Sequence, residues 1–65
     1  MEMDAKDVIE SLTIALKYGD DVRLTAYHTN YLRLSADPMD AADDARMIEI
    51  GWSKVPNSGY WLMGV

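Results

Sequence analysis

Near the N-terminus, apolar residues recur at the three- and four-residue spacing of a helix with one buried face. The residues of this stripe are Ala5, Val8, Ile9, Leu12 and Leu16. Ile14 and Tyr18 lie off the stripe, and periodicity leaves open whether they widen the buried face or remain partly exposed. The pattern predicts an amphipathic helix over residues 4–18, in which Asp4 caps free amides of the first turn. Lys17 lies where the helix dipole favours a cation, and Gly19 can adopt the left-handed conformation that ends a helix.

Two short runs with a period of two follow, as in strands that have one buried face. The predicted inward positions are Val22, Leu24 and Ala26 in the first run and Leu32, Leu34 and Ala36 in the second. The polar break at 28–30 suits a tight turn, in which Asn30 tolerates a positive φ. The two runs predict an antiparallel hairpin.

A second helix is predicted to start at Asp37-Pro38, with Asp37 as the N-cap and Pro38 at the first helical position. Its apolar stripe is Ala41, Ala45, Ile48 and Trp52, flanked by Met39, Ala42 and Met47. Gly51 is expected to close the helix. The segment 47–55 leaves a second interpretation open, a strand, but the agreement of cap and helical spacing favours the helix.

The last part of the chain combines turn composition at 56–59 with an aromatic-rich strand at 60–65, which a stub at 53–55 can pair with. The order α-β-β-α-β predicts one α+β domain over residues 1–65. We expect a two-layer sandwich, a small antiparallel or mixed sheet with both helices on one face. A right-handed crossover through the second helix would place the last strand parallel to the second and next to the first, giving a 2-1-3 order.

The composition and charge of the chain narrow the range of possible functions. The chain has 65 residues, a net charge of −5 and no cysteine, so neither a disulfide framework nor a thiolate metal site is expected. The negative charge argues against a protein that binds nucleic acid through phosphates, and no segment has the length of a membrane span. The acidic start Met1-Glu2-Met3-Asp4 is unlike a secretory signal, which favours a cytoplasmic location.

Few residues are suited to catalysis, so we expect that the chain has no enzymatic activity and binds no cofactor. The single histidine, His28, falls at the predicted turn, where an ordinary surface imidazole is expected. No serine lies in a nucleophile motif, and the four glycines are too dispersed for a phosphate-binding loop.

Carboxylates gather at the start of the second predicted helix, where residues three and four apart share a face. We call Asp40, Asp43 and Asp44 the acidic helix face; Asp37 precedes them. Their spacing does not fit a calcium loop. A solvated surface is the first interpretation, a contact surface for a basic partner the second, and a metal site the least favoured.

Arginine and tyrosine side chains share the outward side of the predicted hairpin. Its members are Arg23, Thr25, Tyr27, Tyr31 and Arg33. Arg and Tyr are enriched at protein interfaces, and a two-layer sandwich leaves this side uncovered. An ordinary solvated sheet, a protein-binding or self-association surface, and a platform for stacking bases all remain open, and the surrounding acidity disfavours the last.

All six aromatic residues are Tyr or Trp, each with a polar group that suits an interface. Trp52 and one of Tyr60 and Trp61 are expected in the core. The remaining aromatic residues are candidates for a contact surface, and the five methionines supply adaptable bulk.

In its size, acidity, lack of cysteine and single α+β domain, the chain resembles small proteins that phages and mobile elements encode to bind and disable host machinery, anti-CRISPR proteins among them. The resemblance implies a stoichiometric inhibitor of a host protein or complex that handles nucleic acid. The contact would be made by the acidic helix face or by the arginine and tyrosine side of the hairpin. The alternative is a homo-oligomeric structural or regulatory domain, such as a homodimer, whose uncovered sheet face is its own interface.

Overall fold

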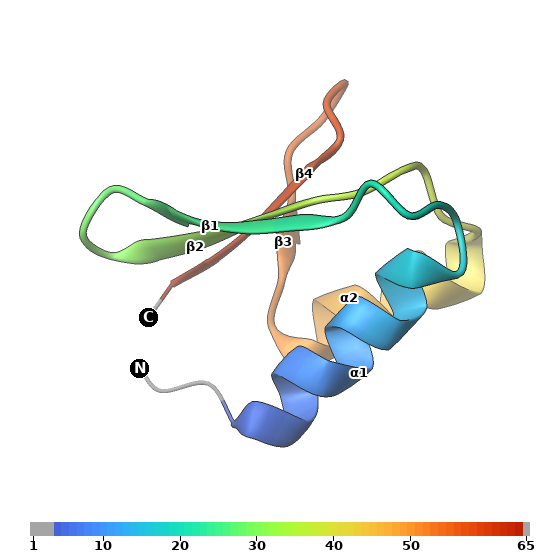
Figure 1. Ribbon diagram of the computed structural model, residues 1–65, viewed down its shortest axis with the longest axis horizontal. Coiled ribbons are helices and arrows are strands. Elements are labelled where there is room, and N and C mark those ends of the chain that lie inside the picture. Colours follow the sequence, from blue (N-terminus) through green and yellow to red (C-terminus); the bar gives the residue numbers. More distant parts are fainter. Residues whose placement is uncertain (1–3, 65) are drawn as a thin grey trace.

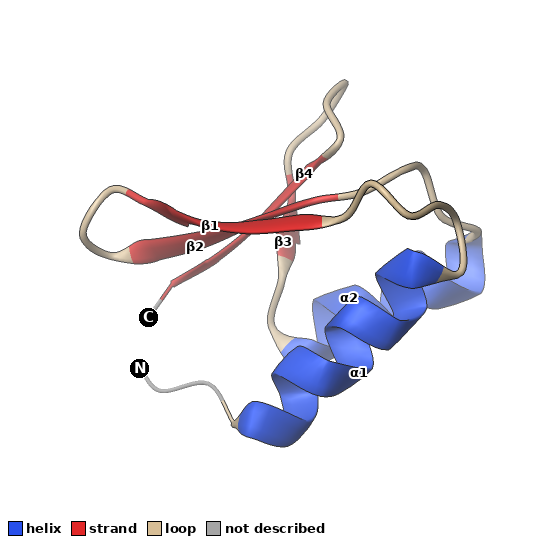
Figure 2. Cartoon of the chain, in the orientation of Figure 1, coloured by secondary structure: helices blue, strands red, loops and turns tan. Residues whose placement is uncertain are grey.

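Two helices cover one face of a four-stranded sheet in the computed structural model, which describes residues 4–64 (Figure 1). In chain order the elements are α1 (Ala5–Leu16), β1 (Arg23–Tyr27), β2 (Tyr31–Ser35), α2 (Ala41–Ile50), β3 (Ser53–Lys54) and β4 (Tyr60–Gly64). The predicted α+β sandwich is confirmed, and β3 is the stub expected before the final strand (Figure 2). Val65, which the sequence pattern places in that strand, lies outside the described residues.

The strands are ordered β1-β2-β4-β3, and every neighbouring pair is antiparallel. The predicted 2-1-3 order, with the last strand parallel to the second, is wrong. The crossover through α2 leads into the two-residue β3, and the turn at 56–59 then reverses the chain. As a result β4 runs back between β3 and β2, and the direction expected for the last strand belongs to β3.

The core lies between the helices and the inner sides of β2 and β4. Its buried apolar residues are Ile14, Ala15, Leu34, Met47, Trp52, Trp61 and Met63. The expectation that Trp52 is a core residue is confirmed at 2% exposure, although it follows α2 instead of lying on its stripe. Of the two adjacent aromatics in β4, Trp61 is buried and Tyr60 is exposed.

The buried side of α1 differs from the predicted stripe. Ser11, Ile14 and Ala15 are buried, whereas Ile9 is 65% exposed and Leu16 is also exposed. Of the predicted stripe, Leu12 packs against the core. Helical periodicity was enough to predict the helix, because both sets of residues repeat at helical spacing. It did not show which set faces the core, and the more hydrophobic set lies partly in solvent.

Ser11 accounts for this orientation of α1. Its hydroxyl donates to the Asp7 carbonyl at 2.6 Å and accepts the indole N–H of Trp52 at 2.8 Å. A hydroxyl with both hydrogen bonds made is buried at little cost, and it satisfies the one polar atom of the Trp52 side chain. Ser11 therefore fixes the helix against the segment that follows α2.

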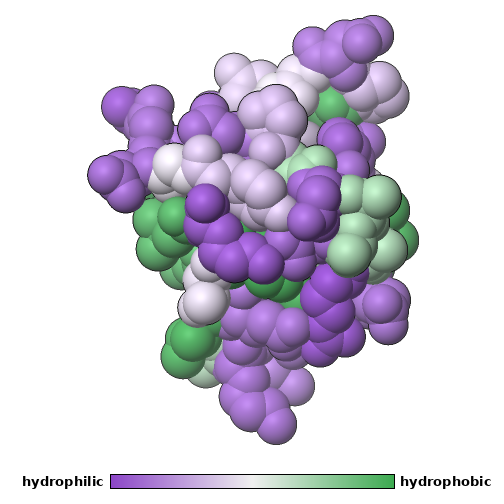
Figure 3. Space-filling view, turned by 90° about the vertical axis from the view of Figure 1, so that its right-hand side faces the viewer, coloured by the Kyte–Doolittle hydropathy of each residue, from purple (hydrophilic) through white to green (hydrophobic). Residues whose placement is uncertain are grey.

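The predicted stripe of α2 is also displaced. Met47 is fully buried, whereas Ala41, Ala45 and Ile48 are exposed. The space-filling view shows hydrophobic groups on both flanks of one face of the molecule, between hydrophilic ones (Figure 3).

The helix α2 begins three residues later than predicted. Its N-cap is Asp40, whose side chain accepts a hydrogen bond from the Asp43 N–H at 2.8 Å, while Asp37 and Pro38 belong to the preceding loop. Both aspartates fit the pattern of a cap. Met39, which lies between them, packs against the core immediately before the helix.

Chain reversals use positive φ at positions that differ in part from the prediction. Gly51 closes α2 with φ 128°, as expected, so the alternative strand over 47–55 is wrong. In the hairpin turn His28, not Asn30, has the positive φ, at 58°. At the end of α1 the cap is Lys17 in a right-handed conformation, and Gly19 does not adopt the left-handed one.

Candidate interaction surface

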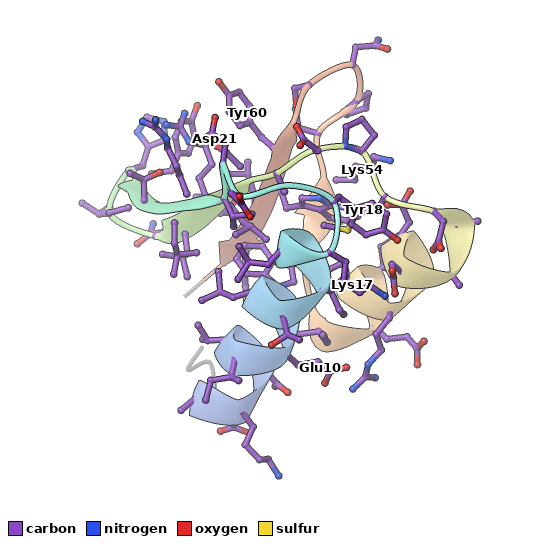
Figure 4. The ribbon with its side chains drawn as sticks, turned by 45° about the vertical axis from the view of Figure 1, so that its right-hand side comes forward. Glu10, Lys17, Tyr18, Asp21, Lys54 and Tyr60 are labelled. Atoms are coloured by element: carbon purple, nitrogen blue, oxygen red, sulfur yellow. The ribbon has the colours of Figure 1, made fainter. Side chains whose placement is uncertain are left out.

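Both helices lie on one face of the sheet, so the opposite face, called here the outer face, is open in the described chain. The strand register places on it Arg23, Thr25 and Tyr27 of β1, Tyr31, Arg33 and Ser35 of β2, and Tyr60 and Leu62 of β4. All five hairpin residues that the sequence pattern assigned to one side are among them. In Figure 4, Tyr60 lies on the side of the sheet away from the helices. Strict alternation with the buried Trp61 was the sequence signal that could have placed Tyr60 there.

Arg33 lies in the middle of the outer face between two tyrosine rings. Its Cζ is 4.7 Å from the ring centroid of Tyr60 and 5.5 Å from that of Tyr27. Thr25 and Leu62 are directly opposite Arg33 on the two neighbouring strands, so the tyrosines are its diagonal neighbours. Such rings hold a guanidinium by cation–π attraction.

The hydrogen-bonding groups of Arg33 are incompletely used within the described chain. No carboxylate of residues 4–64 forms an ion pair with it, and its Nε is buried without a hydrogen-bond partner. An arginine has five N–H donors in a fixed planar arrangement that matches a carboxylate. The guanidinium is thus held in place with donor capacity that the described residues leave unused.

Arg23 and Tyr31 extend the outer face and are more solvated. The Nε of Arg23 lies 3.1 Å from the Asp21 carboxylate, but both side chains are largely exposed, and such a surface pair contributes little. Tyr31 is exposed and directly opposite Tyr27, also exposed. The face therefore has a fixed arginine at its centre, a solvated arginine near one end and a tyrosine pair at the other.

The acidic helix face is held by contacts within the chain. Asp40 caps α2, and Asp43 accepts a hydrogen bond from the Tyr18 hydroxyl and lies 2.7 Å from Lys17 Nζ. These two partners hold the pKa of Asp43 below its usual range. The same contact raises the pKa of Lys17 and that of Tyr18. Lys17 and Tyr18 lie together at the end of α1 in Figure 4.

Asp44 is tied to β3 in the same way. Lys54 Nζ lies 2.8 Å from its carboxylate and 5.6 Å from the ring centroid of Trp61. The side chains of Asp43 and Asp44 are only 16% and 23% exposed. Asp43 and Asp44 thus join α2 to α1 and β3, which leaves little of these two carboxylates to contact a basic partner, whereas Asp40 is exposed and caps α2.

A further ion pair joins the two helices. Arg46 donates from Nε and Nη2 to the two carboxylate oxygens of Glu10, at 2.6 and 2.9 Å. This two-bond geometry holds the pKa of Glu10 below its usual range and raises that of Arg46. Arg46 is thus an arginine whose donors are used by the chain, unlike Arg33.

An open hollow of about 510 Å³ lies between the start of α2 and the turn before β4. Some of its polar groups bond to one another or to nearby backbone, whereas Oδ1 of Asp44 is buried without a hydrogen-bond partner among the described residues. Ser58 donates to the Val55 carbonyl at 2.9 Å and accepts from the Tyr60 N–H at 3.2 Å, and Lys54 pairs with Asp44. The lining provides no nucleophile with an adjacent base.

Other features of residues 4–64 point to no further site. His28 is exposed in the hairpin turn with its ring 4.3 Å from that of Tyr27, and no three His, Asp or Glu residues are grouped to hold a metal ion. Neither α1 nor α2 combines the length and apolar character needed to cross a bilayer. Comparison with known proteins gave no match to a protein family, a curated protein or a solved structure.

Proposed function

We propose that this chain is a non-enzymatic binding protein whose outer face contacts an acidic segment of a partner protein. The observation that carries the proposal is Arg33, which is positioned by Tyr27 and Tyr60 and has no carboxylate partner in the described chain. Because the rings already order the guanidinium, binding would cost less side-chain entropy than for a free arginine.

The composition of the outer face supports a protein partner over a nucleic acid. Tyr and Arg, together with Trp, are enriched at interface hot spots. Only two arginines lie on this face, and the chain carries a net charge of −5, which opposes phosphate binding. A carboxylate flanked by apolar or aromatic groups fits a guanidinium between two tyrosines.

We further propose that the partner is a host protein that handles nucleic acid and that binding inhibits or modulates it in the cytoplasm. The support for this step is the resemblance in size, acidity and single α+β domain to phage-encoded inhibitors such as anti-CRISPR proteins. Between the two surfaces considered from the sequence, the outer face is favoured, because the acidic helix face is engaged within the fold.

The test compares two arginine substitutions, Arg33→Ala on the outer face and Arg46→Ala on the helical side. A partner is captured from bacterial lysate on the immobilised wild-type chain, purified and titrated against each variant by calorimetry. We expect Arg33→Ala to cost on the order of 2 kcal/mol, as at a hot spot. That corresponds to a roughly thirtyfold weaker affinity. Arg46→Ala should bind as the wild type does.

Tryptophan fluorescence confirms that each variant is folded, because Trp52 and Trp61 are both buried. Equal affinity of the wild type and a Tyr27→Ala, Arg33→Ala double variant would show that the outer face is not the contact surface. Failure to recover any partner that binds in a salt-dependent manner would count against the wider proposal of a host inhibitor.

A further inference from the structure

The two edges of the sheet are built differently. At one edge, β3 has two residues, Lys54 lies on the inner side opposite the core residue Trp61, and Pro56 follows. Short length, an inward charge and proline all discourage pairing with another strand. At the other edge, β1 has five residues, contains no proline, and has Leu24 and Ala26 at its inward positions. Among the described strands, the edge at β3 is protected in these ways and the edge at β1 is not.

The inward side of β1 also lacks cover. Every residue of β1 is exposed, and Leu24 remains 39% exposed although its neighbour Leu34 on β2 is fully buried. The turn end of the hairpin extends beyond both helices in Figures 1 and 4. An apolar strip therefore lies along a strand whose outer edge has no neighbour in the described sheet.

We infer that β1 pairs with β1 of a second copy of this chain, antiparallel and about a twofold axis. One such register pairs all five residues, and it is centred on Thr25. In it Arg23 faces Tyr27 of the second copy, Leu24 faces Ala26, and Thr25 faces Thr25. Residues of the outer face meet only residues of the outer face, and inward residues meet only inward ones.

This register suits a second copy because the strand is complementary to itself. Arginine opposite tyrosine and threonine opposite threonine are favourable cross-strand pairs, and no like charges are opposed. A shift by one residue would bring Leu24 and Ala26 opposite outer residues. The twofold axis would also join the two outer faces into one surface with two Arg33 clusters.

A pair of five-residue strands buries less than the roughly 1,200 Å² of a standard interface, so a weak dimer is expected. The association is measured by sedimentation equilibrium of the whole chain at concentrations up to about 1 mM, which detects dimers with dissociation constants up to roughly that value. The wild type should change from monomer to dimer with concentration. A wild type that remains monomeric throughout overturns the inference, whatever becomes of the partner-binding proposal.

Substitutions at Thr25 test the register. The Thr25→Glu substitution places a carboxylate opposite Arg33 within one copy, which is compatible with the fold. Across the twofold axis it places two carboxylates opposite each other, which is unfavourable. We expect it to weaken the dimer at least tenfold, whereas Thr25→Gln and the β3-edge control Ser53→Glu retain it. Equal association of the Thr25→Glu chain, checked as folded by tryptophan fluorescence, overturns the pairing. Restoration of dimer on mixing Thr25→Glu with Thr25→Lys would support it.

Discussion

Ser11 is a polar residue buried beside a small core. It is 1% exposed and links two segments 41 residues apart through its hydrogen bond with Trp52. In a chain of this size the core rarely supplies more than about 3–5 kcal/mol of stability. One buried hydrogen bond is thus a large part of the total, and it also selects which side of α1 faces inward.

Replacement of Ser11 by alanine should lower the free energy of unfolding by about 1–3 kcal/mol, because the indole N–H of Trp52 is left buried without an acceptor. The measurement is urea unfolding followed by tryptophan fluorescence. Thr13→Ala is the matched control. Thr13 donates to the Ile9 carbonyl at 2.7 Å in the same helix but is exposed, so its loss should change stability by no more than about 0.5 kcal/mol. Equal effects of the two substitutions would contradict the assigned role of Ser11.

At the scale of elements, two aspartates near the start of α2 fit the N-cap position, and only one of them caps the helix. Asp37 and Asp40 have the same relation to a following aspartate three positions on, but only Asp40 bonds to the free amide of Asp43. The carboxylate at the cap also complements the positive end of the helix dipole. The stability of α2 should therefore depend on one aspartate and not on the other.

Asp40→Ala should cost about 0.5–2 kcal/mol of unfolding free energy, the usual penalty for loss of an N-cap. Asp37→Ala removes the same group from the preceding loop and should have a clearly smaller effect. Circular dichroism during thermal unfolding of both variants provides the comparison. If Asp37→Ala were the more destabilising substitution, the helix would begin at the proline in solution.

The elements themselves were predictable because helical and strand periodicities are local properties. The alternating sequence pattern alone was enough to predict one shared side of the hairpin for Arg23, Tyr27, Tyr31 and Arg33. The buried sides of the helices were not predictable, because they depend on partners distant in sequence, such as Trp52 for α1. The predicted strand order was wrong because it took the crossover through α2 to lead into the final strand, whereas the crossover leads into β3 and the following turn reverses the chain into β4.

For the whole molecule, with its net charge of −5, acidic residues on the helical side form ion pairs, and the outer face differs from that side. Aspartates and a glutamate of the two helices form the ion pairs that join α1 to α2 and α2 to β3, whereas the outer face has an arginine without an acid partner among the described residues at its centre. The acidic helix face could not be recognised as a structural feature from sequence, because Tyr18 and Asp43 are 25 residues apart. Charge reversal at those aspartates would therefore disturb the fold before it tested a partner.

The contacts of Asp43 predict a stability that falls at both ends of the pH range. A lowered pKa of Asp43 stabilises the folded chain above the pKa of the unfolded one, near 4, and that contribution is lost as the pH falls through the lowered folded value. The raised pKa values of Lys17 and Tyr18 affect stability at the alkaline end of the pH range instead. Their contribution is complete below about pH 10 and is lost as the pH rises through the folded values.

One substitution should therefore flatten both limbs of the pH profile. Asp43→Asn removes the carboxylate that shifts all three groups, so the midpoint of urea unfolding should vary less with pH below 4 and above 10 than in the wild type. Glu10→Gln is the control. Its partner Arg46 remains charged throughout, so this variant should flatten the acid limb alone. An alkaline limb unchanged by Asp43→Asn would mean that Lys17 and Tyr18 do not depend on Asp43 in solution, and that α1 and α2 are joined mainly by the Glu10–Arg46 pair and the apolar core.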